Sequence, residues 1–123
     1  VFYGDERGIS GELEEEYRAP MPWKEEKGTT FAIYKIAIAM RREHEALRRG
    51  RYETVHAKKG DRLYIYAREL PSDKIVIAIN GNRHRSRLPG MFADVDVIWQ
   101  EGFSGSEISG AVLEAMGFVI ARI

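Results

Sequence analysis

Residues 29–50 read TTFAIYKIAIAMRREHEALRRG, and this stretch decides how the rest of the chain is interpreted. From Phe31 to Arg49 it contains neither glycine nor proline and consists mainly of good helix formers. Thr29 and Thr30 are candidate N-caps, because their hydroxyls can accept from the first free backbone N–H groups of a helix. Gly50 is typical of a terminator in the left-handed conformation. We therefore predict one continuous helix that ends at Arg49.

The first half of this helix is apolar on two sides. One row comprises Phe31, Tyr34 and Ile38, and the other comprises Ile33, Ile36, Ala37 and Met40. Surface helices of globular proteins usually carry a single apolar stripe, which faces one core. A helix with two such rows needs two packing partners.

The segment before the helix is an apolar run followed by a long polar loop. Residues 1–3 (Val-Phe-Tyr) are β-type and stop at the glycine-flanked stretch 4–8. The loop continues through an acidic stretch at 12–16 and a segment with two prolines at 18–23, where no helix can continue. The chain begins at Val1 on this run, as if something upstream were missing. Loops of about 20 residues in compact domains are usually functional, although a plain surface excursion is the alternative.

After Gly50 the hydrophobic period changes from helical to alternating. Alternation of apolar and polar residues is the pattern of half-buried strands, and turn residues separate the successive runs. Strands are expected at 52–57, 62–68, 74–80, 94–100, about 107–113, and 117–123, with a polar connector at 81–93. Short strands at this spacing predict an antiparallel sheet or sandwich.

Composition excludes several classes of function. The 123 residues contain no cysteine, so disulfides, thiolate nucleophiles and zinc–thiolate sites are ruled out. The 19 basic and 19 acidic side chains cancel, and no apolar run approaches the roughly 20 residues of a membrane span. We expect neither a nucleic-acid nor a membrane partner. The low content of Asn and Gln beside many Lys, Arg and Glu favours a heat-adapted source.

Catalytic candidates are few. Asp5 and Glu6 are the carboxyl pair to consider, but in an extended chain neighbours point to opposite faces and cannot flank one bond. A solvated loop end is the alternative reading of this pair. His44, His56 and His84 fall on a helix, a strand and a loop, without the spacing of a metal site, so ordinary hydrogen-bonding roles are favoured. We expect no catalysis by this chain alone.

Arginine clusters raise one further possibility. They lie at 41–42, 48–51 and 83–87, and Tyr64 and Tyr66 share one face of a predicted strand. Arginines that contact phosphates beside aromatic rings that stack on bases would suit RNA. Because the whole chain is neutral, solvated surface arginines are the favoured reading.

Three blocks of sequence together resemble the family 13 glycoside hydrolases, the α-amylase superfamily, and especially its neopullulanase, cyclomaltodextrinase and maltogenic amylase branch. Residues 2–8 (Phe-Tyr-Gly-Asp-Glu-Arg-Gly) resemble the Tyr-Tyr-Gly-x-Glu-x-Gly motif that ends the eighth barrel strand. Residues 18–23 (Arg-Ala-Pro-Met-Pro-Trp) resemble an Arg-x-Pro-Met-x-Trp segment of the following loop. Residues 40–50 resemble the last barrel helix, usually Leu-Arg-Lys-Glu-His-Pro-Ala-Leu-Arg-x-Gly.

The resemblance implies an α+β fold, in which the last strand and helix of a (β/α)8 barrel precede an antiparallel β-sandwich C-terminal domain. Residues 1–50 would end the catalytic barrel, and residues 51–123 would form the β-domain. Active sites of such barrels lie at the C-terminal ends of the strands, so the loop after Tyr3 would face the substrate cleft.

The resemblance also implies a set of substrate-binding residues. Glu14 and Arg18 fall where the neopullulanase branch has an acidic residue and an arginine, four apart, that shape the glucan-binding cleft. Tyr3 and Glu6 fall in the motif at the end of the barrel strand. Glu stands here where the branch often has Asp-Pro. The catalytic carboxylates of the family lie on earlier strands, outside these 123 residues.

The expected function is therefore that of the C-terminal portion of a retaining α-glucan hydrolase, with a cleft loop and a stabilising β-domain but without catalytic residues. The expected partners are an α-glucan in the parent protein and, for this chain, either the missing barrel or a second copy. No cofactor is expected, and calcium use by the parent stays open. The alternative is a stand-alone β-sheet carbohydrate-binding or interaction module, with Trp99, Tyr64 or Tyr66 stacking on sugars.

Overall fold

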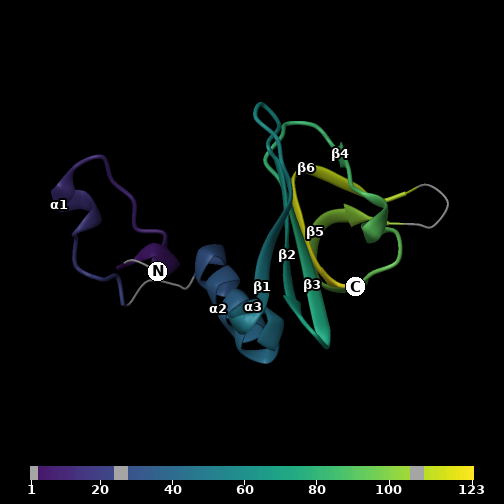
Figure 1. Ribbon diagram of the computed structural model, residues 1–123. Helices are drawn as coiled ribbons and strands as arrows, with labels where there is room; N and C mark the ends of the chain where they lie inside the picture. Colours follow the sequence, from purple (N-terminus) through teal and green to yellow (C-terminus); the bar gives the residue numbers. More distant parts are fainter. Residues whose placement is uncertain (1–2, 24–27, 106–109) are drawn as a thin grey trace. The chain divides into compact units, whose positions relative to one another are not determined.

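The computed structural model describes residues 3–23, 28–105 and 110–123. The chain divides into two compact units, Val1–His44 and Glu45–Ile123. The first unit is helix and loop, whereas the second is built mainly from strands (Figure 1). Each unit is described by itself.

The first unit contains three short or medium helical elements. They are the 3-10 helix η1 (Asp5–Arg7), the single-turn helix α1 (Glu14–Tyr17) and the longer helix α2 (Thr29–Glu43). Of the predicted strand at 1–3, Val1 and Phe2 lie outside the described residues, and Tyr3 belongs to a turn.

Helix α2 differs from its prediction at both ends. Its N-cap is Gly28, and no side chain caps it, so the expected capping by Thr29 or Thr30 is wrong. It ends at Glu43, because His44 is extended with φ −96° and ψ 111°. The predicted single helix to Arg49 is therefore two helices, and the second, α3 (Glu45–Arg49), belongs to the other unit.

Tertiary contacts hold α3 in place, and they override the helical propensity at the break. Ala46 is completely buried, and α3 packs against two strands of the sheet. The guanidinium of Arg68 donates to the carbonyl oxygens of Ala46 and Arg48, both at 3.4 Å. Gly50 does not have a positive φ, so its predicted role as a left-handed terminator is wrong. A Cβ there would lie 2.5 Å from the Ala46 oxygen and 2.8 Å from the Glu69 nitrogen, so the glycine permits a close backbone approach.

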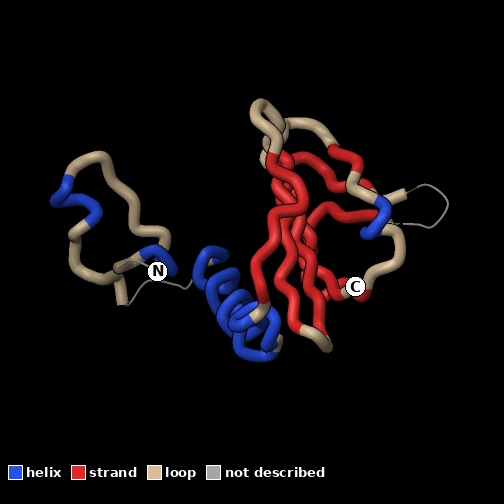
Figure 2. The backbone as a smooth tube through the Cα atoms, in the orientation of Figure 1, coloured by secondary structure: helices blue, strands red, loops and turns tan. Residues whose placement is uncertain are grey.

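The second unit is one antiparallel sheet in which two parts fold over a common core (Figure 2). The strand order is β1-β2-β3-β6-β4, and β5 also pairs with β6. The strands are β1 (Arg51–Ala57), β2 (Leu63–Leu70), β3 (Asp73–Asn80), β4 (Ser86–Arg87), β5 (Asp96–Ser104) and β6 (Val112–Arg122). The predicted antiparallel β-domain is confirmed, as a single hydrogen-bonded sheet and not as two separate sheets.

Strand β6 connects the two parts of this sheet. Its residues 118–122 pair with β3 on one side and with β5 on the other, whereas its start pairs with β4 and with the end of β5. The strands expected at 107–113 and 117–123 are thus one strand from Val112, while residues 106–109 lie outside the described part. A bend within β6 allows this continuity, because Met116 has φ 59° and Gly117 is buried close to the Glu101 carbonyl.

The core lies between the two parts of the sheet. It comprises Leu63, Ile65, Ala67, Val76, Ala78, Leu88, Phe92, Ala111, Leu113, Val119 and Ala121. Leu88 and Phe92, the latter in the 3-10 helix η2 (Gly90–Phe92), come from the connector that we predicted to be polar. That prediction is wrong for Leu88 and Phe92. Both are buried, although the connector before them is rich in arginine. No helix in the described part of the chain is long and apolar enough to cross a membrane.

Candidate substrate-binding loop

The loop of the first unit starts with a tight turn between two glycines. Gly4 and Gly8 have φ angles of 80° and 69°, a region that favours glycine. The backbone N–H groups of Arg7 and Ile9 both donate to the Gly4 carbonyl, at 2.9 and 3.1 Å. Asp5 and Glu6 therefore sit in one 3-10 turn (η1), so the assumption that they continue an extended strand is wrong.

Two contacts anchor this turn within the unit. The Tyr3 hydroxyl donates to the carbonyl oxygen of Ala19 at 3.1 Å, which joins the turn to the proline-containing segment. The guanidinium carbon of Arg7 lies 5.4 Å from the centroid of the Phe31 ring, a cation–π contact with α2. The predicted site residue Tyr3 thus positions the loop next to Arg18.

Helix α1 presents the predicted acidic residue and arginine as a pair. Arg18 and Glu14 lie four residues apart, and their side-chain nitrogen and oxygen are separated by 2.9 Å. Both side chains are mostly exposed, at 70% and 62%, so the pair adds little stability. An exposed guanidinium that is held in one direction suits hydrogen bonding to the hydroxyls of a ligand.

Glu16 fixes the start of α1. Its carboxylate accepts from the backbone N–H groups of Glu12 at 2.8 Å and Leu13 at 3.2 Å. The bonds from Leu13 and then Glu12 lower the pKa of Glu16, because they stabilise the ionised form. The short helix is therefore capped by its own third residue.

A shallow depression of about 440 Å³ lies beside the Glu14–Arg18 pair. Its lining residues are Glu14, Glu15, Arg18, Ala19 and Pro20. The structure thus brings two of the four predicted site residues, Glu14 and Arg18, to one surface. Tyr3 lies behind this surface through its bond to Ala19, and half-buried Glu6 lies in η1, outside the lining.

The aromatic residues of the alternative reading lie on the β-unit. The rings of Tyr52 and Tyr64 each lie 5.5 Å from the ring of Tyr66, tilted by 31°. The hydroxyls of Tyr52 and Tyr64 are hydrogen-bonded to each other. Burial raises the pKa of Tyr66. Trp99 contacts Phe118 edge to face at 4.7 Å. These rings pack on each other, and such packing leaves less of their faces for sugar stacking.

Sequence reasoning missed a polar network in the β-unit. His56 Nε2 lies 2.9 Å from Oδ2 of Asp61, and the other carboxylate oxygen of Asp61 accepts from the Leu63 N–H and the Asn82 amide. The hydrogen bond from the Leu63 N–H has the largest effect, and together these bonds lower the pKa of Asp61 to about 2. The sequence contained one indication of buried polar contacts in this unit. Asn80 places a polar side chain on the same face of the strand as Val76 and Ala78, which are buried.

No cluster of three or more potential metal ligands occurs within residues 3–23, 28–105 and 110–123. His84 Nδ1 lies 3.1 Å from the Arg85 carbonyl, and His44 ends α2. The three histidines therefore lie in separate environments.

Known proteins resemble both the sequence and the fold, although no family model matches. A cyclomaltodextrinase from a Bacillus species is 35% identical over 85 residues, which is 68% of this chain and 15% of that protein. Neopullulanase 2 from Thermoactinomyces vulgaris is 27% identical over 113 residues, which is 89% of this chain and 19% of that protein. The chain thus spans less than a fifth of these relatives.

Solved structures agree with these relatives. A cyclomaltodextrinase structure superposes with a TM-score of 0.73 and 32% identity, over 99% of this chain and 22% of that chain. A debranching enzyme from Nostoc punctiforme, soaked with acarbose, gives a TM-score of 0.74 over all of this chain and 25% of that one. At 22% identity, the second likeness concerns the fold alone.

Proposed function

Because this chain is a relative of the family 13 glycoside hydrolases, the α-amylase superfamily, we propose that it is the C-terminal portion of an α-glucan-acting hydrolase of maltodextrin, cyclodextrin or pullulan type. The observation that carries the proposal is the match to a cyclomaltodextrinase over 99% of the chain at 32% identity. The names of the relatives refer to cyclomaltodextrin and to pullulan, both of which are α-glucans. In this proposal the first unit ends the catalytic barrel and the second stabilises it.

The loop of the first unit then borders the substrate cleft. Arg18 is the residue with the clearest role, because its fork lies on the surface of the depression and Glu14 sets its direction. It would donate hydrogen bonds to glucose hydroxyls, while Glu14 both orients it and accepts from a further hydroxyl. The carboxylates that cleave the glycosidic bond, by double displacement with retention, come from the rest of the parent.

The chain offers a matched control for Arg18. Arg49 is also an exposed arginine in an i, i+4 pair with a glutamate, Glu45, at 3.4 Å. In the enzyme that carries this segment, Arg18→Ala should lower kcat/KM for maltodextrin by roughly 10- to 100-fold, the value of one or two hydrogen bonds from a charged donor. Arg49→Ala should leave kcat/KM unchanged. Equal effects of the two variants would contradict the proposed role of Arg18.

The isolated chain should show no glycosidase activity, because the proposal places all catalytic carboxylates elsewhere. The measurement is release of reducing sugar from maltodextrin and pullulan by the purified chain. Turnover that persists through purification and is lost on mutation of this chain would contradict the proposal.

A stand-alone carbohydrate-binding module is the second candidate, favoured by the tyrosines of β1 and β2. A titration with maltodextrin, followed by tryptophan fluorescence, separates the two functions. A binding module responds alone, whereas part of a hydrolase should respond weakly or not at all. The tight packing of Trp99 on Phe118 supports the second outcome.

The exposed apolar side chains of helix α2 support the proposal that another chain or domain packs against this helix. None of its residues is buried, and Ile33, Ile36 and Ile38 are 45–47% exposed. We propose that the remainder of the parent covers these side chains, or a second copy when the chain is alone. Sedimentation of the purified chain should show self-association that Ile33→Ser/Ile36→Ser abolishes. A monomer at all concentrations would count against the second copy.

A further inference from the structure

Hydrogen bonds hold two segments of the β-unit next to each other. The loop between β1 and β2 spans 58–62, and the segment after β3 spans 81–87. The Gly81 N–H donates to the Arg62 carbonyl at 2.9 Å, and the Asn82 amide donates to the Asp61 carboxylate at 3.1 Å. These bonds fix the two loops as one surface, which we call the basic surface.

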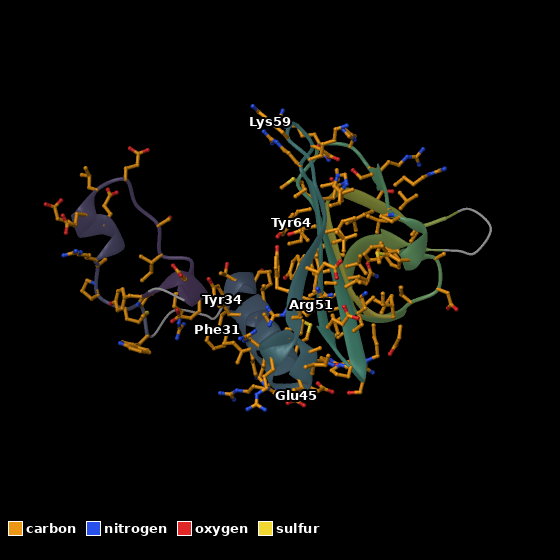
Figure 3. All side chains as sticks on the ribbon, viewed as in Figure 1. Phe31, Tyr34, Glu45, Arg51, Lys59 and Tyr64 are labelled. Carbon is orange, nitrogen blue, oxygen red and sulfur yellow. The ribbon has the colours of Figure 1, made fainter. Side chains whose placement is uncertain are left out.

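The basic surface gathers cations that have no partner. Its exposed cations are Lys58, Lys59, Arg62, Arg83, Arg85 and Arg87. Within the described part of the chain, none of these side chains forms an ion pair or hydrogen bond. Elsewhere in the β-unit, by contrast, Arg49, Arg51, Lys74 and Arg122 each lie within 4.0 Å of a carboxylate. In Figure 3, Lys59 lies at the end of the β1–β2 hairpin, far from labelled Glu45.

The local charge is strongly positive although the whole chain is neutral. Asp61 is the only carboxylate in residues 58–62 and 81–87. Its oxygens are already engaged with His56, the Leu63 N–H and the Asn82 amide. Concentrating like charges without counter-ions costs free energy, and an anionic ligand would recover it. The rigid anchoring of the loops reduces the entropy lost on binding.

The kind of anion follows from the side chains present. Arginines donate two parallel hydrogen bonds to phosphoryl oxygens, and lysines act as point charges beside them. The two segments contain one aromatic ring, that of His84, whose Nδ1 lies 3.1 Å from the Arg85 carbonyl oxygen, so they offer little surface on which bases or sugars can stack. The neutral total charge also lacks the long-range field that draws a protein to nucleic acid.

We propose that the basic surface binds phosphoryl groups, as carried by an oligophosphate or by a phosphorylated sugar. The proposal does not depend on glucan hydrolysis, because the surface lies in the β-unit and uses none of the loop residues discussed above.

The test is calorimetric titration of the full chain with inorganic tripolyphosphate at low salt. Arg83→Gln/Arg85→Gln should weaken binding at least tenfold. The matched control is Arg41→Gln/Arg42→Gln on α2, which removes the same charge from another surface and should change affinity less than twofold. Raising salt from 50 to 200 mM should weaken binding, because salt screens the attraction between exposed charges. Circular dichroism confirms that each variant is folded.

Further titrations identify the source of the phosphoryl group. Glucose 6-phosphate binding more tightly than inorganic phosphate, with maltose silent, supports a phosphorylated sugar. Tripolyphosphate binding alone supports an oligophosphate. The proposal is overturned if tripolyphosphate does not bind, if both double variants weaken it equally, or if a DNA oligonucleotide binds more tightly at the same salt.

Discussion

Asn80 is predicted to be the most important polar side chain in the β-unit. It is 1% exposed, the only buried polar residue among those described, and it lies at the end of β3. Its amide nitrogen donates to the carbonyl oxygens of His84 at 3.0 Å, Leu113 at 3.1 Å and Glu114 at 2.9 Å. Its carbonyl oxygen accepts from the Asn82 N–H at 3.0 Å and the Ser86 hydroxyl at 3.2 Å. One side chain thus joins β3, β6 and the segment 81–87, which ends in β4.

The cost of removing this side chain follows from these bonds. The amide has two hydrogens and its oxygen accepts two bonds, so about four full hydrogen bonds are lost in Asn80→Ala. At about 1 kcal/mol each, reduced where water reaches the partly buried partners, the free energy of unfolding should fall by about 3 kcal/mol. Ser86→Ala removes only the hydroxyl and should cost about 1 kcal/mol. Asn80→Asp keeps the shape but turns a carboxylate toward three carbonyl oxygens, so it should be the worst of the three at neutral pH.

Urea unfolding measures these differences, with Trp99 as the reporter in a Trp23→Phe background. Trp23 is 75% exposed, whereas Trp99 contacts Phe118 in the sheet. Lowering the pH should reduce the defect of Asn80→Asp, because protonation of the introduced carboxylate restores a donor. The reasoning is refuted if Asn80→Ala costs no more than Ser86→Ala.

Three further changes test other parts of the structure. Gly50→Ala should cost about 1 to 3 kcal/mol, because its Cβ would lie 2.5 Å from a backbone oxygen, whereas Gly90→Ala meets nothing within 4 Å; equal thermal shifts would contradict this. Asp61 has a pKa lowered from 3.8 to about 2, so its stabilisation is complete above about pH 4 and lost toward pH 2. Urea unfolding of Asp61→Asn should differ from the unsubstituted chain above pH 4 and converge with it in acid, not in base. Glu45→Pro should raise stability by about 0.4 to 1 kcal/mol in thermal unfolding, since His44 is already extended, as a residue before proline requires.

The strands that the sequence predicted well are those with unambiguous alternation. In β2, the buried Leu63, Ile65 and Ala67 alternate with half-buried residues, so period and burial agree. Prediction failed where a breaker residue lies inside an element. Gly117 separated two predicted strands, yet it lies within β6, where its lack of a Cβ allows the approach to the Glu101 carbonyl. Composition alone does not distinguish a glycine that ends a strand from one that permits close packing.

The candidate loop was predictable to a different extent. The family resemblance pointed to Glu14 and Arg18 as a pair four residues apart, and the structure brings their side chains to 2.9 Å, on a short helix that we had expected to be loop. The hydrogen bond from the Tyr3 hydroxyl to the Ala19 carbonyl could not be predicted from the sequence. It joins residues that are 16 positions apart, and its acceptor is a backbone oxygen, which any residue has. The His56–Asp61 pair was missed for a related reason, since the residues approach across the hairpin between β1 and β2.

The break at His44 links the fold to the proposed function. The resembled family has proline at the position of Glu45, and proline forces the preceding residue out of the helical region. This chain lacks the proline, yet His44 is extended. The break must therefore be stabilised by its surroundings, and the buried Ala46 together with the Arg68 bonds to α3 supply that stabilisation. Because His44 is extended without a following proline, we attribute this conformation to the packing around it. The same packing holds α3 against β2 and β3, as expected of a β-domain that stabilises the barrel.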